Sequence, residues 1–305
     1  MRIAMVSAHF ELPVDSIPIG GVQRHIARVS AALRERGHEV MWTYPGITAI
    51  PNTTSVIDAR SAVEWCDALV MHDFCSWMDT QGKPNLVVFH GWEGQCPPDA
   101  GIMRRRQEIA AAAGATIAVG AFIPKWYGHQ VDEVIWGAVD PPGKEESTVA
   151  ERDLAVWIGR LDPDTSCLDA IRWAVEQGYR VEVYGDGDLR VPLEQMRDSI
   201  PGACVLLYGW APDAAKQFSR AAVALPSGLL TLLEAESRGK PCYATWANPL
   251  KQDYWMLHPY PPAAISPLAF PAFEGLSPKW QTARHWAGKQ TWSSIADIYE
   301  RLLEQ

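Results

Sequence analysis

The sequence lacks long hydrophobic runs, paired cysteines and an excess of positive charge, and each absence excludes a class of protein. No apolar run approaches the roughly 18 residues of a membrane span, and Met1–Val6 is too short for the apolar core of a signal peptide. The six cysteines are scattered, with no CxxC pair and no His/Cys cluster at zinc-ligand spacing. We therefore expect a reduced, cytoplasmic chain without a transmembrane segment.

The net charge of −9 argues against a protein whose whole surface binds nucleic acid or anionic membranes. A local basic patch stays open, and Arg104-Arg105-Arg106 is the candidate. Three consecutive arginines could meet an anionic acceptor, a lipid phosphate or nucleic acid. A solvated helix face is the alternative that we favour.

The sequence does contain enough apolar residues, 48% of 305, for two domains with separate cores. Short apolar runs alternate with helical patterns in both halves, which predicts an α/β fold with parallel sheets covered on both faces. A polar, Pro/Gly-rich stretch at 140–147 divides the halves. We predict a Rossmann-like domain at 1–142, a second Rossmann-like domain at 143–285, and a C-terminal helix at 286–305 that packs back on the first domain.

Periodicity places the individual elements. Gly20-Gly21 opens a helix whose apolar residues Val22, Ile26, Val29 and Leu33 lie on one face. Strands are predicted at 3–7, 39–44, 68–71, 86–89, 115–119, 134–136, 154–158, 181–184, 205–207, 222–225 and 242–245, and further helices at 168–175, 229–238 and 293–303. Residues 247–292 are rich in tryptophan and proline and show no regular period, so an irregular surface segment is predicted there.

Ligands of open parallel sheets bind beyond the carboxyl ends of the strands, and with two facing sheets that place is the cleft between the domains. Five loops follow predicted strands and should line this cleft: Gly20-Gly21, His90-Gly91, Gly159-Arg160, Gly185-Asp186-Gly187 and Pro226-Ser227-Gly228.

Two of these loops place glycine before a helix, where backbone N–H groups can approach an anion closely. Gly20-Gly21 is not followed by GKS or GKT and lacks GxGxxG spacing, so it is neither a Walker loop nor a dinucleotide fingerprint. After Ser227-Gly228, the helix N-terminus could bind phosphate and Glu234 could accept hydrogen bonds from ribose hydroxyls. The alternatives are a tight turn at the first site and a capped helix with a solvated glutamate at the second.

Gly159-Arg160 puts a permanent cation at the end of a predicted strand. A guanidinium group can hold a diphosphate through two hydrogen bonds and stabilise it as a leaving group. The alternative is a surface salt bridge between Arg160 and Asp162 or Asp164.

Taken together, in this order and spacing, the motifs resemble the group-1 glycosyltransferases (glycosyltransferase family 4), and the resemblance covers nearly the whole chain. The segments that carry it in the first half are GGVQRHIARVSAALRERGHEV, LVVFHGWEG and VIWGAVDP. In the second half they are WIGRLDPDTS, VEVYGDGD and VALPSGLLTLLEAESRGKPCYAT. The sequence departs from the family at two positions, because the family's phosphate lysine falls on Thr165 and its first glutamate on Pro226.

The resemblance implies a GT-B fold and transfer of a sugar from a nucleotide diphospho-sugar, with a UDP- or GDP-sugar expected, to an acceptor hydroxyl. We expect no cofactor, and no metal either, because Arg160, the N–H groups of Gly20-Gly21 and the helix N-terminus after Gly228 would neutralise the diphosphate. The donor-binding residues that it implies are Gly20, Gly21, Gly159, Arg160, Gly185, Ser227, Gly228, Leu229 and Glu234.

Arg160, His90 and Asp73 are the predicted catalytic residues. The histidine that matches His90 in the family approaches the donor sugar, and a structural histidine is the alternative. Asp73 and Glu93 follow predicted strands, and either could be the general base for an acceptor hydroxyl.

Two further patterns carry weaker signals. Asp162-Pro163-Asp164 and Asp186-Gly187-Asp188 spell the DxD string of metal-dependent transferases, but the string is common by chance and the predicted architecture differs. Of the 14 tryptophans, three fit buried positions (Trp42, Trp157, Trp173) and four lie in or after loops, where they could stack on a sugar or base (Trp77, Trp92, Trp126, Trp246).

The acceptor is not readable, and a glycan, a small molecule and a DNA base all stay open. Three rival functions follow. A nucleotide-sugar 2-epimerase would need more carboxylates and histidines in the cleft. A weakened protein that binds a nucleotide or partner is suggested by the changes at Thr165 and Pro226. A phage-type DNA-base glycosyltransferase is suggested by the arginine cluster and opposed by the acidic charge.

Overall fold

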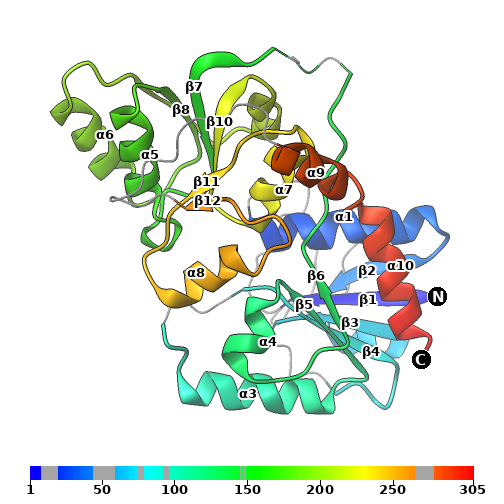
Figure 1. Ribbon diagram of the computed structural model, residues 1–305. Helices are drawn as coiled ribbons and strands as arrows, with labels where there is room; N and C mark the ends of the chain where they lie inside the picture. The colour runs from blue at the N-terminus through cyan, green and yellow to red at the C-terminus, as the bar shows by residue number, and fades with distance from the viewer. Residues whose placement is uncertain are drawn as a thin grey trace. The chain divides into compact units, whose positions relative to one another are not determined.

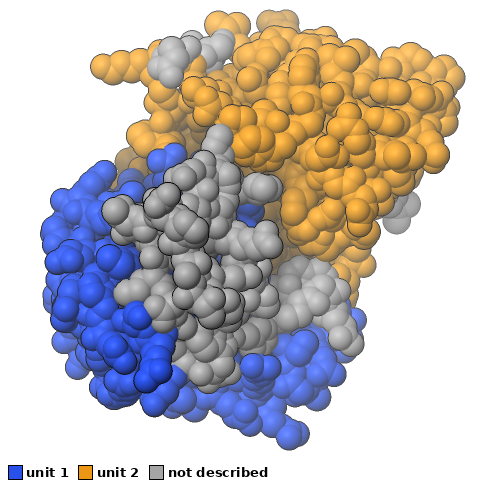
Figure 2. Space-filling view, turned by 180° about the vertical axis from the view of Figure 1, so that it is seen from behind, with its two compact units in different colours: residues 1–137, 291–305 blue, residues 138–290 orange. Residues whose placement is uncertain are grey.

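The computed structural model describes residues 1–7, 20–43, 59–73, 79–91, 96–144, 146, 149–264 and 278–305. The chain divides into two compact units, which Figure 2 distinguishes by colour. Unit 1 comprises Met1–Gly137 and Thr291–Gln305, and unit 2 comprises Ala138–Gln290. The first unit thus ends before residue 142, and the returning segment begins after residue 286. Within the described residues, no helix is both long and apolar enough to cross a membrane.

Unit 1 is built on a six-stranded parallel sheet with the order β2-β1-β3-β4-β5-β6 (Figure 1). Its strands are β1 (Arg2–Ser7), β2 (Glu39–Thr43), β3 (Ala68–His72), β4 (Asn85–Phe89), β5 (Ala115–Val119) and β6 (Glu133–Ile135). Its helices are α1 (Gly21–Glu35), α2 (Ala59–Trp65), α3 (Ala100–Ala112), α4 (Phe122–Tyr127) and α10 (Trp292–Leu303). The strand order reverses at β1 and β3, which makes their carboxyl ends the switch point of this sheet.

Helix α10 belongs to unit 1 although it ends the chain. It packs against α1 and buries the apolar side that the sequence pattern predicts, including Ile295 and Leu302. The ring nitrogen Nε2 of His25 lies 2.8 Å from the hydroxyl of Tyr299, and Arg36 donates to Glu300 at 2.5 Å. The last helix is therefore attached by both apolar packing and polar contacts.

Unit 2 is built on a four-stranded parallel sheet with the order β10-β7-β8-β9. The strands are β7 (Glu151–Ile158), β8 (Arg180–Tyr184), β9 (Val205–Gly209) and β10 (Ala221–Pro226). Helices α5 (Cys167–Glu176) and α6 (Arg190–Ser199) contribute to the core on one face. The core on the other face includes residues of η2 (Ala214–Ser219), α7 (Leu229–Ser237), α8 (Pro249–Met256) and α9 (Pro278–Ala287). The switch point lies between β7 and β10, because the chain runs from β7 to β8 on one side and reaches β10 on the other.

Two sequence-based expectations for unit 2 are wrong. The predicted strand at 242–245 does not extend the main sheet: β11 (Tyr243–Ala244) pairs with β12 (Ala263–Ala264), and one bridge joins Cys242 to Ala224 of β10. The segment 247–292 is not an irregular surface segment, because its described part includes α8 and α9 and buries Trp255 and Trp280. Trp255 and Trp280 contribute to the core of unit 2, whereas Trp286 is half-buried.

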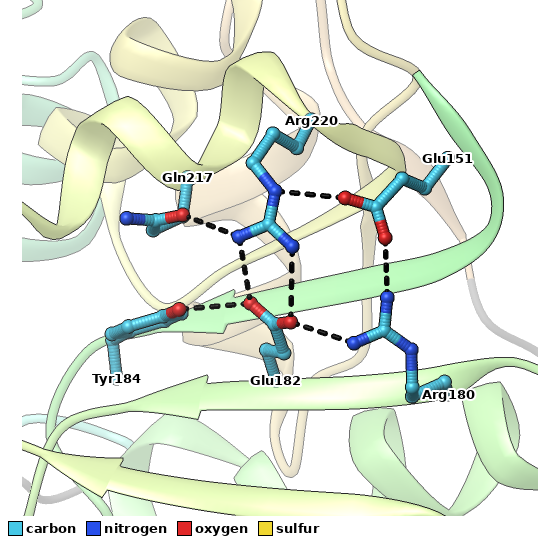
Figure 3. Close-up of polar contacts among 6 residues, drawn as sticks. All are labelled: Glu151, Arg180, Glu182, Tyr184, Gln217 and Arg220. Atoms are coloured by element: carbon cyan, nitrogen blue, oxygen red, sulfur yellow. Dashed lines mark hydrogen bonds and ion pairs between the residues drawn. The ribbon is translucent and has the colours of Figure 1, made fainter. Parts of the chain in front are cut away.

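A network of charged groups crosses the sheet of unit 2 near the start of its strands (Figure 3). At its centre, the carboxylate of Glu182 is almost completely buried. It accepts hydrogen bonds from Arg180 at 2.8 Å, from the hydroxyl of Tyr184 at 2.8 Å and from Arg220 at 3.3 Å. Both arginines also contact Glu151, which is closer to solvent. A buried carboxylate is tolerated when it is paired and hydrogen-bonded in this way.

Candidate functional site

The carboxyl ends of β7, β8 and β10 bring three turns of unit 2 into contact. Ile158 pairs with Pro226 of β10 and with Tyr184 of β8, so the residues that follow these strands start at the same level. A Cβ atom added to Gly159 would overlap the side chain of Ser227, and one added to Gly185 would overlap the carbonyl of Gly159. The backbones can approach this closely only because glycine has no side chain. Three predicted donor residues therefore meet at the switch point of this sheet.

Arg160 begins at this meeting point and has a largely exposed side chain, with 58% of its surface accessible. Its guanidinium contacts both carboxylates of the following turn, Asp162 and Asp164, the latter at 2.9 Å. Thr165 fixes that turn, because its hydroxyl lies 2.7 Å from the carbonyl of Asp162 and 3.2 Å from that of Arg160. The predicted cation is present at the strand end, and the alternative salt bridge is present as well.

The N-terminus of α7 is capped by its own surroundings. The hydroxyl of Thr231 accepts from the N–H groups of Ser227 and Gly228, each at 3.1 Å. The hydroxyl of Tyr254, on α8, accepts from the N–H of Leu229 at 2.6 Å. These are the donors that a phosphate was expected to use. A phosphate that binds here must compete with these two hydroxyls or displace them.

Glu234 lies on α7 and is almost completely buried, with 2% of its surface exposed. The alternative reading of a solvated helix residue is therefore wrong. Two residues of the next turn close over its backbone, because Ser237 and Arg238 both donate to the carbonyl of Glu234 at 2.9 Å. Its role toward a ribose stays a prediction.

A lysine that the sequence analysis did not single out lies beside this turn. Lys251, on α8, is buried, and its Nζ lies 3.5 Å from the carbonyl of Ser227. The same Nζ lies 4.0 Å from the ring centre of Tyr254. Burial lowers the pKa of Lys251 to about 8, and Arg160 and Asp164 are close enough to act on it in opposite directions. No motif marks this residue, because it reaches the site from a different element.

In unit 1, Asp73 and His90 follow the neighbouring strands β3 and β4 and are joined to each other. The carboxylate of Asp73 accepts the backbone N–H of His90 at 2.9 Å. Asp73 itself has a φ of 57°, a left-handed conformation that is rare outside glycine. Arg106 lies 4.0 Å from the same carboxylate oxygen. The two predicted catalytic residues are therefore brought together in one buried polar cluster.

The ring of His90 lies in a buried cluster with two other histidines, His25 and His72, which no sequence motif marks as functional. Nε2 of His90 lies 2.8 Å from Nδ1 of His72, and the ring of His25 packs edge-on against His90. Burial, together with the positive charge of Arg106, lowers the pKa of His90 to about 3. Burial also keeps the pKa values of His25 and His72 well below the usual range. All three rings are therefore neutral at physiological pH.

The expectation of a solvated arginine cluster is wrong for one of its three residues. Arg104 and Arg105 are exposed, as predicted, but Arg106 is buried. Its guanidinium lies over the ring of Tyr127 at 4.1 Å and donates to the carbonyl of Gly91 at 2.8 Å. Arg106 therefore belongs to the core around the Asp73 cluster. It does not contribute to a basic surface patch that could bind an anion.

Neither a scan against models of known protein families nor a search of curated proteins finds a match. Solved structures do match. AviGT4, a glycosyltransferase involved in avilamycin A biosynthesis, aligns over 99% of this chain and 97% of its own, with 17% identity and a TM-score of 0.70. HepE from Anabaena, solved with UDP and glucose, aligns over 100% of both chains with 13% identity and a TM-score of 0.65. TarM aligns over 78% of this chain and 55% of its own, with 12% identity and a TM-score of 0.56.

The chain has the GT-B fold. The predicted fold class, α/β with parallel sheets, is confirmed. At these identities the likeness shows the GT-B fold alone.

Other predicted residues of this GT-B chain have mixed outcomes. Gly21 is open to solvent, but the backbone of Gly20 is covered by the side chain of Gln23. In the second DxD string, Asp186 accepts from the N–H of Gly187 and lies 3.3 Å from Arg190. Among the described residues, no group of three or more His, Cys, Asp or Glu side chains is arranged to hold a metal ion.

The tryptophans singled out in the sequence differ in how deeply they are buried. Trp157 and Trp173 are buried as predicted. The predicted burial of Trp42 is wrong, because its side chain is half-buried, as are those of Trp126 and Trp246. The remaining predicted candidates, Trp77, Trp92 and Glu93, lie outside the described residues.

Proposed function

We propose that this protein is a glycosyltransferase that moves a sugar from a nucleotide diphospho-sugar to an acceptor hydroxyl, with the donor bound by unit 2 and the acceptor by unit 1. The observation that carries the proposal is the contact of the turns at Gly159, Gly185 and Ser227 at the switch point of the second sheet, with Arg160 beside them. Switch points are where open α/β sheets bind nucleotides. The matched structures of HepE, solved with UDP and glucose, and of TarM, solved with UDP, support a UDP-sugar as the first donor to test.

In this proposal, Arg160 pairs with the diphosphate and stabilises the negative charge that develops as the sugar departs. Asp162 and Asp164 hold the guanidinium in place, and on donor binding one of these contacts exchanges for a phosphate oxygen. Glu234 accepts hydrogen bonds from the donor ribose. The cationic groups of the site neutralise the charge of the departing diphosphate, so the reaction needs no metal ion.

On the acceptor side, Asp73 is the proposed general base. Ring nitrogen Nε2 of His90 already lies 2.8 Å from Nδ1 of His72, a contact that argues against His90 in that role. We propose instead that His90 positions Asp73 through its backbone N–H, which donates to that carboxylate.

The direct test is thermal unfolding in the presence of UDP-, GDP-, ADP- and TDP-sugars. A donor at 100 times its dissociation constant should stabilise the folded protein by roughly 2.7 kcal/mol. Release of the nucleoside diphosphate from the stabilising donor, with and without an acceptor mixture, then reports transfer or hydrolysis. Activity that persists in excess EDTA supports the metal-free reaction. The proposal fails if none of these donors stabilises the protein.

A second candidate is a GT-B protein that binds a nucleotide without transferring sugar. One observation favours it: Thr165, where the resemblance places a phosphate lysine, carries no charge, and its hydroxyl bonds the carbonyls of Arg160 and Asp162. The same experiment separates the two candidates: a stabilising nucleotide-sugar that is never consumed supports the second one.

A further inference from the structure

Helix α8 carries two polar side chains to the first turn of α7. Asn248 caps α8 by accepting the N–H of Lys251 at 2.8 Å, which starts the helix with Lys251 in its first turn. One turn later, the hydroxyl of Tyr254 takes the N–H of Leu229. The ammonium of Lys251 lies 3.5 Å from the carbonyl of Ser227, the residue whose side chain occupies the space beside Gly159.

This ammonium group is buried with little compensation. Only 4% of the surface of Lys251 is exposed. In the described part of the chain, no carboxylate oxygen lies within 4.0 Å of Nζ, and its neighbours are one distant carbonyl and the rings of Tyr254 and Trp255. A buried ammonium is normally paired with a carboxylate, because leaving it alone is costly. This free-energy cost, located at a turn that follows a strand, indicates a site where a bound ligand supplies the anion.

We propose that Lys251 is the second cation of the donor site and pairs with the diphosphate of the nucleotide together with Arg160. The inference rests on the proposed function and deepens it. Thr165, where the resemblance places a lysine, instead uses its hydroxyl to fix the Arg160 turn. Lys251 supplies the missing charge from another element of the same unit.

The proposal has a consequence for protons. In the protein without a bound ligand, Lys251 has a pKa of about 8, and the charged groups that act on it are Asp164 and Arg160. The nearby phenol of Tyr254 stays neutral. A diphosphate beside the ammonium favours the protonated form and raises this pKa. Binding at pH 8 should therefore take up about half a proton per site, and binding at pH 7 much less, because the group is then already protonated.

The test is titration calorimetry of the full chain with UDP, and separately with inorganic pyrophosphate, at pH 7 and pH 8. Each titration is run in two buffers of different ionisation enthalpy, which gives the number of protons taken up. The wild type should take up about half a proton at pH 8. Lys251→Met should lose this uptake and bind both probes at least 10-fold more weakly. Lys251→Arg, which keeps a permanent charge, should lose the uptake but recover most of the affinity.

Lys240→Met is the matched control, because Lys240 is another buried lysine of unit 2 whose pKa is lowered by burial, and it follows the far end of α7. It should leave affinity and proton uptake unchanged. Unchanged affinity and uptake in Lys251→Met would overturn the role of Lys251 while leaving the proposed function intact. If the wild type binds neither UDP nor pyrophosphate, nor GDP in a further titration, the proposed function itself fails. If Lys251→Met does not fold, Lys251→Arg decides, since uptake that persists in this variant contradicts the inference.

Discussion

Unit 2 buries an ionisable side chain in two regions, and the two regions differ in whether that side chain has an oppositely charged partner. Glu182, near the start of the strands, is enclosed by Arg180, Arg220 and the hydroxyl of Tyr184 (Figure 3). Lys251, near the ends of the strands, has no carboxylate partner among the described residues. A fully paired charge costs little and serves the fold, whereas an unpaired one lowers stability and needs a reason. The difference separates architecture from a candidate site in the same unit.

A third buried side chain, the carboxyl group of Glu236, stays neutral instead of being paired. Glu236, on α7, lies 3.8 Å from Nδ1 of His258, which is formally salt-bridge distance. Burial raises the pKa of Glu236 to about 9 and lowers that of His258 to about 4, so both groups are neutral at pH 7. The pair is therefore not an ion pair at neutral pH, and the desolvation that prevents charging explains why it is tolerated.

The largest expected effect comes from breaking the paired network. Glu182→Ala removes the buried one of the two carboxylates that contact Arg180 and Arg220, together with the acceptor of the Tyr184 hydroxyl, and should lower the free energy of unfolding by about 3 kcal/mol. Denaturant unfolding measures the change. Glu176→Gln, at an exposed position on α5, is the control and should cost less than about 0.5 kcal/mol. A loss as small as that of the control would mean that the network contributes no stability.

The next effect depends on pH. The folded protein keeps a proton on Glu236 that the unfolded chain loses above its ordinary pKa, so stability falls as pH rises toward 9. Glu236→Gln cannot lose this proton. Relative to the wild type, the variant should gain about 2 kcal/mol of stability between pH 6 and pH 7.5, because the difference changes by about 1.4 kcal/mol per pH unit. Parallel stability curves for the two proteins across this range would refute the neutral-pair account.

A smaller effect tests Glu234, the buried carboxyl assigned to the ribose. Glu234→Gln should weaken binding of UDP by about 10-fold, equivalent to about 1.4 kcal/mol, which is the order of one hydrogen bond. Inorganic pyrophosphate has no ribose, so its affinity should stay the same. Titration calorimetry compares the two ligands, and equal losses for both would assign Glu234 a structural role.

Most of the fold was predictable because buried parallel strands appear in a sequence as short continuous apolar runs. The predicted strand 115–119 has the same bounds in the structure, and 86–89 is one residue short of β4. Helix α8 was missed although Asn248-Pro249 is a helix-start signal. Its buried residues Leu250, Lys251 and Trp255 include a charged one, so no apolar period appears.

The candidate site was only partly predictable, for a related reason. Gly159, Arg160 and Ser227 were found because strand, turn and helix succeed one another locally. Lys251 reaches the same turn from a helix more than twenty positions further along the chain, and Tyr254 does the same. Burial of such side chains is decided by tertiary packing, which leaves no local pattern in the sequence. The same holds for Arg106 and for the histidine cluster of unit 1.

The most direct test of the account compares two arginines of strand β7 and its turn. Arg160 follows the carboxyl end of the strand, and Arg152 is exposed at the opposite end. We predict that Arg160→Ala weakens UDP binding by 10- to 100-fold, in line with about 1.5–3 kcal/mol for a charged hydrogen-bond partner. Arg152→Ala should bind UDP as the wild type does. Titration calorimetry at pH 7 gives both values. Equal affinities for the two variants would contradict the placement of the donor diphosphate at the strand ends of unit 2.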